Sequence, residues 1–94
     1  MRRLSWEEFA EAAGTVYRVE GEGSPGVEMT LERAVELSSS GREGGSFRLE
    51  FRGPFEPILA QGIYQVHGGE EPAEIFVVPV GRKDSGTLYE AVFY

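Results

Sequence analysis

The chain has 94 residues, of which 40% are hydrophobic, and its formal net charge is −7. This length provides one domain, and the apolar content is sufficient for a packed core. The excess of acidic side chains argues against nucleic acid and against an anionic membrane as partners, since both require a basic surface. Because the chain has no cysteine, disulfides, thiolate catalysis and cysteine-based zinc sites are excluded.

The first clear pattern predicts a helix over about residues 5–13. A Ser-x-x-Glu capping box begins at Ser5, and apolar side chains follow at helical spacing. Gly14 can end this helix in a left-handed conformation. A helix of this length is not stable alone in water, so we expect Trp6 and Phe9 to anchor it on the rest of the domain.

The hydrophobic period then changes to two, which predicts strands over 15–20 and 27–37. In the second strand Val35 is expected on the same apolar face as the preceding apolar residues. Arg33 interrupts that face and indicates a β-bulge or a strand that passes over the rim of a barrel. A helix over 29–38 is the alternative, since several of the same side chains also fit helical spacing.

Residues 46–52 alternate between apolar and charged side chains and predict a half-buried strand. If Val35 faces Leu49 in an antiparallel pair, two glutamates of the preceding strand oppose two arginines of this one. Opposite charges that meet across a pair stabilise it by about 0.2–1 kcal/mol and help to fix the register. The two predicted pairs are Glu36 with Arg48 and Glu32 with Arg52.

Three more strands are predicted over 61–67, 74–80 and 87–94, separated by segments rich in glycine and proline. The run Ile75–Val78 is apolar at every position, which is typical of a strand covered on both faces. One helix and about six strands with short connections indicate an all-β domain, an antiparallel meander that curls into a small barrel or compact sandwich. The helix is expected to plug an open end or to cover one face.

Few residues suggest chemistry. His67 is the only histidine, and with Glu70 and Glu71 it provides too few well-placed ligands for a structural or catalytic metal. His67 and Asp84 could be combined with a serine, but no nucleophile motif supports such a triad. Glu90 interrupts the last apolar strand.

Glu90 is more readily explained as a buried partner of Arg33 or Arg52 than as a catalytic acid. The aromatic residues could line a ligand pocket, but at strand spacing they are expected to form the core. We assign no catalytic, cofactor-binding or metal-ligating residue and expect no cofactor.

Four sequence blocks carry a resemblance to a known family: Phe47–Pro54 (FRLEFRGP), Gln61–Tyr64 (QGIY), Phe76–Gly81 (FVVPVG) and Tyr89–Phe93 (YEAVF). In this order they resemble the signature blocks of a small bacterial family of domains of unknown function. The resemblance implies a stand-alone β-domain without assigned activity, associated with phage-tail-collar-like proteins. It provides no catalytic residues to carry over.

These observations favour a non-enzymatic structural or protein-interaction module, within a bacterial tail-like assembly. Exposed strand edges and the C-terminal residues 92–94 are its expected contacts with a protein partner or a second copy. A small-molecule-binding β-barrel is the alternative, and a hydrolase-type enzyme that uses His67 and Glu90 is the third. The sequence shows neither a signal peptide nor a transmembrane segment, so we expect a cytoplasmic protein.

Overall fold

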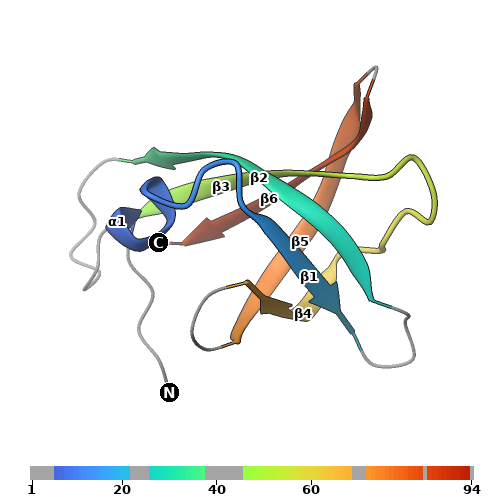
Figure 1. Cartoon of the computed structure of the whole chain (residues 1–94), viewed down its shortest axis with the longest axis horizontal. Coiled ribbons are helices and arrows are strands. Elements are labelled where there is room, and N and C mark those ends of the chain that lie inside the picture. The colour runs from blue at the N-terminus through green and yellow to red at the C-terminus, as the bar shows by residue number, and fades with distance from the viewer. Residues whose placement is uncertain (1–5, 22–25, 38–45, 69–71, 84, 94) are drawn as a thin grey trace.

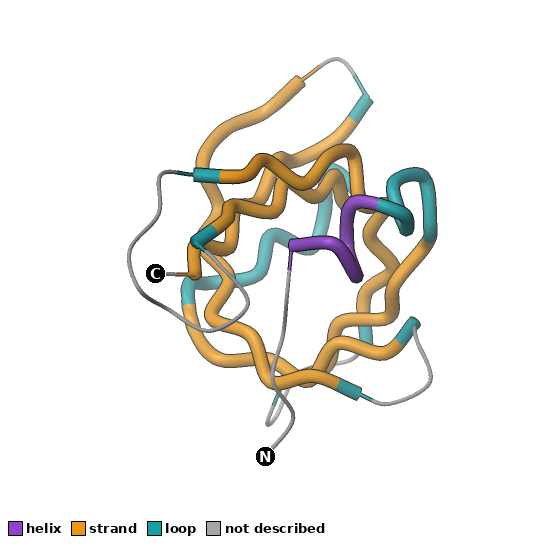
Figure 2. Tube along the Cα trace, turned by 90° about the vertical axis from the view of Figure 1, so that its left-hand side faces the viewer, coloured by secondary structure: helices purple, strands orange, loops and turns teal. Residues whose placement is uncertain are grey.

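The computed structural model of the chain describes residues 6–21, 26–37, 46–68, 72–83 and 85–93. Six antiparallel strands form a closed barrel, and one short helix lies at an end of it (Figures 1 and 2). The all-β barrel expected from the sequence is thereby confirmed. The elements are α1 (Trp6–Ala10), β1 (Val16–Glu20), β2 (Val27–Glu36), β3 (Phe47–Gly53), β4 (Gly62–His67), β5 (Ala73–Lys83) and β6 (Gly86–Phe93).

The strands follow the order β1-β2-β3-β6-β5-β4 around the barrel. Two three-stranded meanders, β1–β3 and β4–β6, are therefore joined along β3–β6 and along β4–β1, and the expectation of one continuous meander is wrong. Pro54 and Pro57 prevent a tight hairpin after β3, so residues 54–61 carry the chain across to β4. Closure pairs both sides of every described strand over part of its length, so the expected docking through exposed strand edges has only the unpaired parts of these strands available.

The barrel interior is filled by one cluster of apolar side chains, which come from alternate positions of every strand. Tyr17 meets Phe51 edge to face, with ring centroids 5.9 Å apart, and Phe47 stacks on Phe93 at 4.4 Å. The buried hydrophobic residues are Phe9, Tyr17, Val19, Val27, Met29, Leu31, Phe47, Leu49, Phe51, Leu59, Tyr64, Val66, Ala73, Ile75, Val77, Tyr89 and Ala91.

The irregularity that Arg33 indicates in β2 is a bulge: the register with β3 shifts between Leu31 and Arg33. The helical alternative for this segment is thereby overturned, since β2 continues as a strand to Glu36. An extra residue reverses which face the later side chains take. Ala34 consequently pairs with Leu49, and Val35 lies opposite Arg48, not opposite Leu49 as expected.

Helix α1 plugs one end of the barrel, as Figure 2 shows. Phe9 inserts between Tyr17 and Phe47, with centroid distances of 6.5 Å and 5.9 Å, and the Trp6 indole Nε1 donates to the Ala34 carbonyl at 3.2 Å. The helix ends at Ala10, earlier than the expected residue 13. After Ala10 the chain turns, and its backbone forms hydrogen bonds with β2 before β1 begins. Ser5, the expected cap, lies outside the described residues.

The junction with β2 consists of two backbone hydrogen bonds. The Gly14 N–H donates to the Leu31 carbonyl at 2.7 Å, and the Leu31 N–H donates to the Thr15 carbonyl at 2.9 Å. Gly14 has a φ of 92°, which is the left-handed conformation expected for it. The end of the helix is thus held by the strand that the helix covers.

The barrel closes along a short seam between β1 and β4. Three register pairs make this seam: Arg18 with His67, Val19 with Val66 and Glu20 with Gln65. Extending the register by one residue on each side sets Tyr17 against Gly68 and Tyr64 against Gly21. Both tyrosine rings lie so close to the opposite glycine that an added Cβ would overlap them. An aromatic ring that covers a glycine on a neighbouring strand strengthens such a pairing.

Candidate functional site

The outer wall of the barrel divides into a charged half and an apolar half. The charged half is formed by outward side chains of β1, β2 and β3, with contributions from β4 and β6. Its arginines and glutamates are largely paired with each other, and these surface pairs are screened by solvent. The pairs, with their N–O distances, are Arg18–Glu20 (2.9 Å), His67–Glu20 (3.0 Å), Arg33–Glu50 (3.1 Å), Arg48–Glu50 (3.0 Å), Arg48–Glu90 (3.9 Å) and Arg52–Glu32 (3.2 Å).

The β2 bulge changes the expected charge pairs between β2 and β3. Glu32 reaches Arg52 as expected, but diagonally, since the backbone partner of Arg52 is Thr30. The expected opposition of Glu36 and Arg48 is wrong, because the register sets Glu36 against Phe47.

Glu90 was expected to be buried and paired with Arg33 or Arg52, and the structure shows neither. It approaches Arg48, not Arg33 or Arg52, and its side chain is 35% exposed. A buried charge at this position is therefore excluded.

The apolar half lies on β4, β5 and β6. Ile63 and Phe76 are direct cross-strand partners, and 63% and 51% of their surfaces are exposed. Val80, further along β5, is 54% exposed. Outward positions of β5 and β6 extend the patch on either side. We call this surface the apolar face; it consists of Ile63, Phe76, Val78, Val80, Leu88 and Val92.

Sequence reasoning missed this face, although the signal was present. The run Ile75–Val78 was expected to be covered on both sides. Ile75 and Val77 point into the core and are each 1% exposed, whereas Phe76 points outward and nothing in the described chain covers it. The middle of the outer side of β5 therefore has the composition of an interior surface while it faces solvent.

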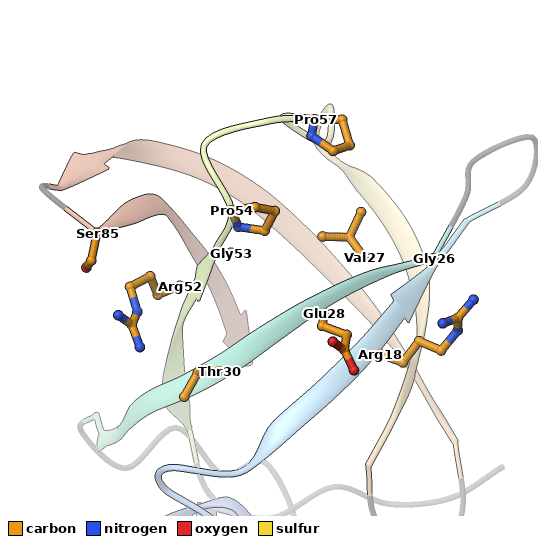
Figure 3. A pocket seen from close by; sticks show the side chains of 10 residues that line it. All are labelled: Arg18, Gly26, Val27, Glu28, Thr30, Arg52, Gly53, Pro54, Pro57 and Ser85. Atoms are coloured by element: carbon orange, nitrogen blue, oxygen red, sulfur yellow. The ribbon is translucent and has the colours of Figure 1, made fainter.

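Two clefts are lined by described residues. The larger, of about 560 Å³, is an open groove beside β1, β2 and β3 (Figure 3). Arg18 and Arg52 lie on opposite sides of it, with Glu28 and Thr30 on β2 between them. Both guanidinium groups already bind a neighbouring glutamate. The groove is thus a mixed-charge surface and has no unpaired arginine to attract an anion.

The smaller cleft, of about 290 Å³, borders the apolar face. Val80 and Leu88 provide its apolar part, and its charged lining consists of Glu32, Glu50, Glu90 and Lys83. Three of these side chains belong to the ion pairs of the charged half. Most of the side chains that line the two clefts point outward, and each cleft also reaches a core residue, Val27 in the larger and Tyr89 in the smaller. The interior that the described residues define is filled by aliphatic and aromatic groups.

His67 lies at the end of β4 and binds the Glu20 carboxylate together with Arg18. The hydrogen bond from Arg18, with a smaller contribution from His67, lowers the pKa of Glu20 below its ordinary value of 4.5. His67 and Glu90 are not brought together, because β5 separates β4 from β6.

The other residues considered for chemistry are Glu70, Glu71 and Asp84, which lie outside the described residues. Within the ranges that the structure describes, no group of three metal-binding side chains occurs. Of the aromatic residues, Tyr17, Phe47, Phe51, Tyr64 and Tyr89 are core residues, whereas Phe55 and Phe76 are exposed.

The fold and the outer wall define the class of this protein: a small closed antiparallel β-barrel with ion pairs mainly on β1, β2 and β3 and an apolar patch on β4, β5 and β6. The chain belongs to the family described as domain of unknown function (DUF6916), whose model matches residues 4–93. Neither a curated protein nor a solved structure matches the chain. No helix among the described residues is long and apolar enough to cross a membrane.

Proposed function

We propose that this protein is a non-enzymatic structural or interaction module that binds another protein through the apolar face. The observation that carries the proposal is the exposed cross-strand pair of Ile63 and Phe76 on that face. An isolated exposed apolar residue needs no explanation, but a contiguous apolar patch on a small domain is typical of an interaction surface. Aromatic side chains are also enriched at such interfaces.

The contrast with the other half of the wall supports the same proposal. There the charged side chains bind each other, so partner binding would have to displace existing ion pairs. On the apolar face, burial would remove hydrocarbon from water at about 25 cal/mol per Å². The ion pair that reaches this face is Arg48–Glu90, since Glu90 lies between Leu88 and Val92 on β6. The favourable contact area for a protein partner is therefore on β4, β5 and β6.

The proposal assigns no catalytic role to His67 and Glu90, the two residues considered for a hydrolase-type enzyme. His67 is held against Glu20 and Arg18, and Glu90 lies on a different strand beside Arg48. These contacts are sufficient to explain both residues as parts of surface ion pairs. The resemblance to chains associated with tail-collar-like proteins makes a bacterial tail-like assembly the proposed setting.

The experiment is affinity capture from the native host with three forms of the protein. We expect the wild type and Val16→Ser to capture the same protein, and Phe76→Ser to lose it. Val16 is the matched control, because it is 52% exposed but lies on β1, away from the apolar face. Capture that is equal for Phe76→Ser and Val16→Ser, with both variants folded, would contradict the proposal.

A further inference from the structure

The outward row of β5 has an acidic end, an apolar middle and a basic end. Glu74 and Phe76 are exposed on the outer side, Val78 pairs with the outward Glu90, and Val80 and Lys83 line the outer cleft. A register shift between Pro79 and Gly81 keeps the later residues of this row on the same side. Glu74 and Lys83 form no ion pair with any residue that the structure describes, unlike most charges of the other half.

Two copies of this row are complementary when they lie antiparallel, because the acidic end of each then meets the basic end of the other. At about 3.3 Å per residue, Glu74 lies about 13 Å from Val78 on one side, and Lys83 lies at a similar distance on the other once the bulge is allowed for. A two-fold axis close to Val78 would therefore place Glu74 of each copy near Lys83 of the other. The same axis would bring Phe76 of each copy onto Val80 of the other.

Such symmetry is what a dimer interface between identical subunits requires, since one patch must serve both partners. The neighbouring strands widen the contact: Ile63 lies beside Phe76 on β4, and Leu88 and Val92 continue the surface on β6. We infer that the occupant of the apolar face is a second copy of this chain, bound face to face with β5 antiparallel to β5 of the partner. This inference rests on the proposed function and specifies its partner.

The test is sedimentation velocity of the purified full chain between about 1 μM and about 1 mM, a range that covers moderate to weak dimers. We expect a concentration-dependent dimer for the wild type and for Val16→Ser. Phe76→Ser and Ile63→Ser should weaken dimerisation by about tenfold or more, and circular dichroism should show that both stay folded. A wild type that is monomeric throughout, or a Val16→Ser variant as weakened as Phe76→Ser, overturns the inference.

Charge exchange tests the orientation of the two copies. Glu74→Lys and Lys83→Glu should each weaken the dimer, because each sets like charges against each other at both ends of the interface. The double variant Glu74→Lys/Lys83→Glu restores opposite charges and should recover most of the affinity. A double variant that dimerises no better than the single variants contradicts the antiparallel arrangement.

The two proposals fail differently. If the wild type is monomeric but capture from the host still depends on Phe76, a second copy is excluded and a different protein partner remains. If neither dimerisation nor capture depends on Phe76, both the inference and the proposed function are wrong.

Discussion

At the seam between β1 and β4, two tyrosine rings cover two glycines. Tyr17 and Tyr64 are core residues, so neither ring can move outward without opening the barrel. Gly21 and Gly68 leave the space that these rings occupy. The closure of the barrel therefore depends on the absence of a side chain at Gly21 and Gly68. The sequence pattern identifies both glycines only as turn residues.

Gly68→Ala is expected to destabilise the protein by about 1–3 kcal/mol, as overpacking of a well-filled core does. The new Cβ would lie 2.8 Å from Cε2 of the Tyr17 ring. Gly62→Ala, at the first residue of β4, is the matched control, because the atom nearest to its new Cβ would be Cε2 of Tyr64 at 3.8 Å. Urea denaturation measures both, and equal midpoints for the two variants would contradict this account of the seam.

The outer side of the seam is expected to give a pH-dependent contribution to stability through Glu20. Its pKa is lowered in the folded protein, so the contribution is present above the ordinary value of 4.5 and is lost as the pH falls through the lowered pKa. Glu20→Gln should therefore reduce the urea midpoint at pH 6, and its difference from the wild type should shrink below pH 4.5. In an Arg18→Gln background the effect of Glu20→Gln should be smaller at pH 6, and a difference that persists unchanged at low pH would refute the explanation.

At the scale of the elements, much of the fold could be predicted because most strands carry a period-two pattern, and β1, β3 and β4 end at or directly before a glycine. The bulge at Arg33 was also visible, since a charged residue interrupts the apolar face there. The effect of this bulge on the partners of Val35 and Glu36 could not be predicted. A single extra residue moves every later side chain of the strand to the opposite face of the sheet. The pairing of β3 with β6 depends on how the whole sheet closes, and no local pattern encodes it.

The candidate site was less predictable than the fold for a related reason. Phe76 belongs to an apolar run, and such a run indicates that both faces of a strand avoid water. It does not indicate whether the cover comes from the same chain or from another one. Only the strand order of the closed barrel answers this question. In that order, no element among the described residues covers the outer side of β4, β5 and β6.

Helix α1 contributes to stability chiefly through Phe9, which is 3% exposed and contacts two core rings. Phe9→Ala is expected to cost about 3 kcal/mol, the usual range for removing a buried aromatic side chain. Glu7→Ala, at an exposed position on the same helix, should change the free energy of unfolding by less than about 0.5 kcal/mol. Similar denaturation midpoints for the two variants would mean that the helix does not plug the barrel.

The end of β6 belongs to the barrel, although an apolar C-terminus was expected to be offered to a partner. Phe93 pairs with Phe47 in the ladder and stacks on its ring with an interplanar angle of 18°. Phe93→Ala should therefore lower stability by about 1–3 kcal/mol, with Val16→Ala as an exposed strand control. Thermal or urea unfolding measures the loss, and an unchanged midpoint would make Phe93 a candidate contact residue, as Val92 of the apolar face already is. Tyr94 lies outside the described residues.

For the molecule as a whole, the net charge of −7 conceals an uneven surface. Ion pairs occupy the wall formed mainly by β1, β2 and β3, and hydrocarbon occupies the wall formed by β4, β5 and β6. A domain that acted alone would gain nothing from an interior-like strand face left in water. The division of the wall is the property on which the proposed role in protein association rests.

The most direct test of that role is photo-crosslinking with a benzophenone-bearing phenylalanine analogue in place of Phe76, compared with the same analogue in place of Val16. Illumination in the native host followed by mass spectrometry identifies the chain that each position contacts. We expect crosslinks from position 76 to another protein chain, with a second copy of this chain as the product, and few from position 16. No crosslinks from position 76, or equal yields from both positions, would contradict it.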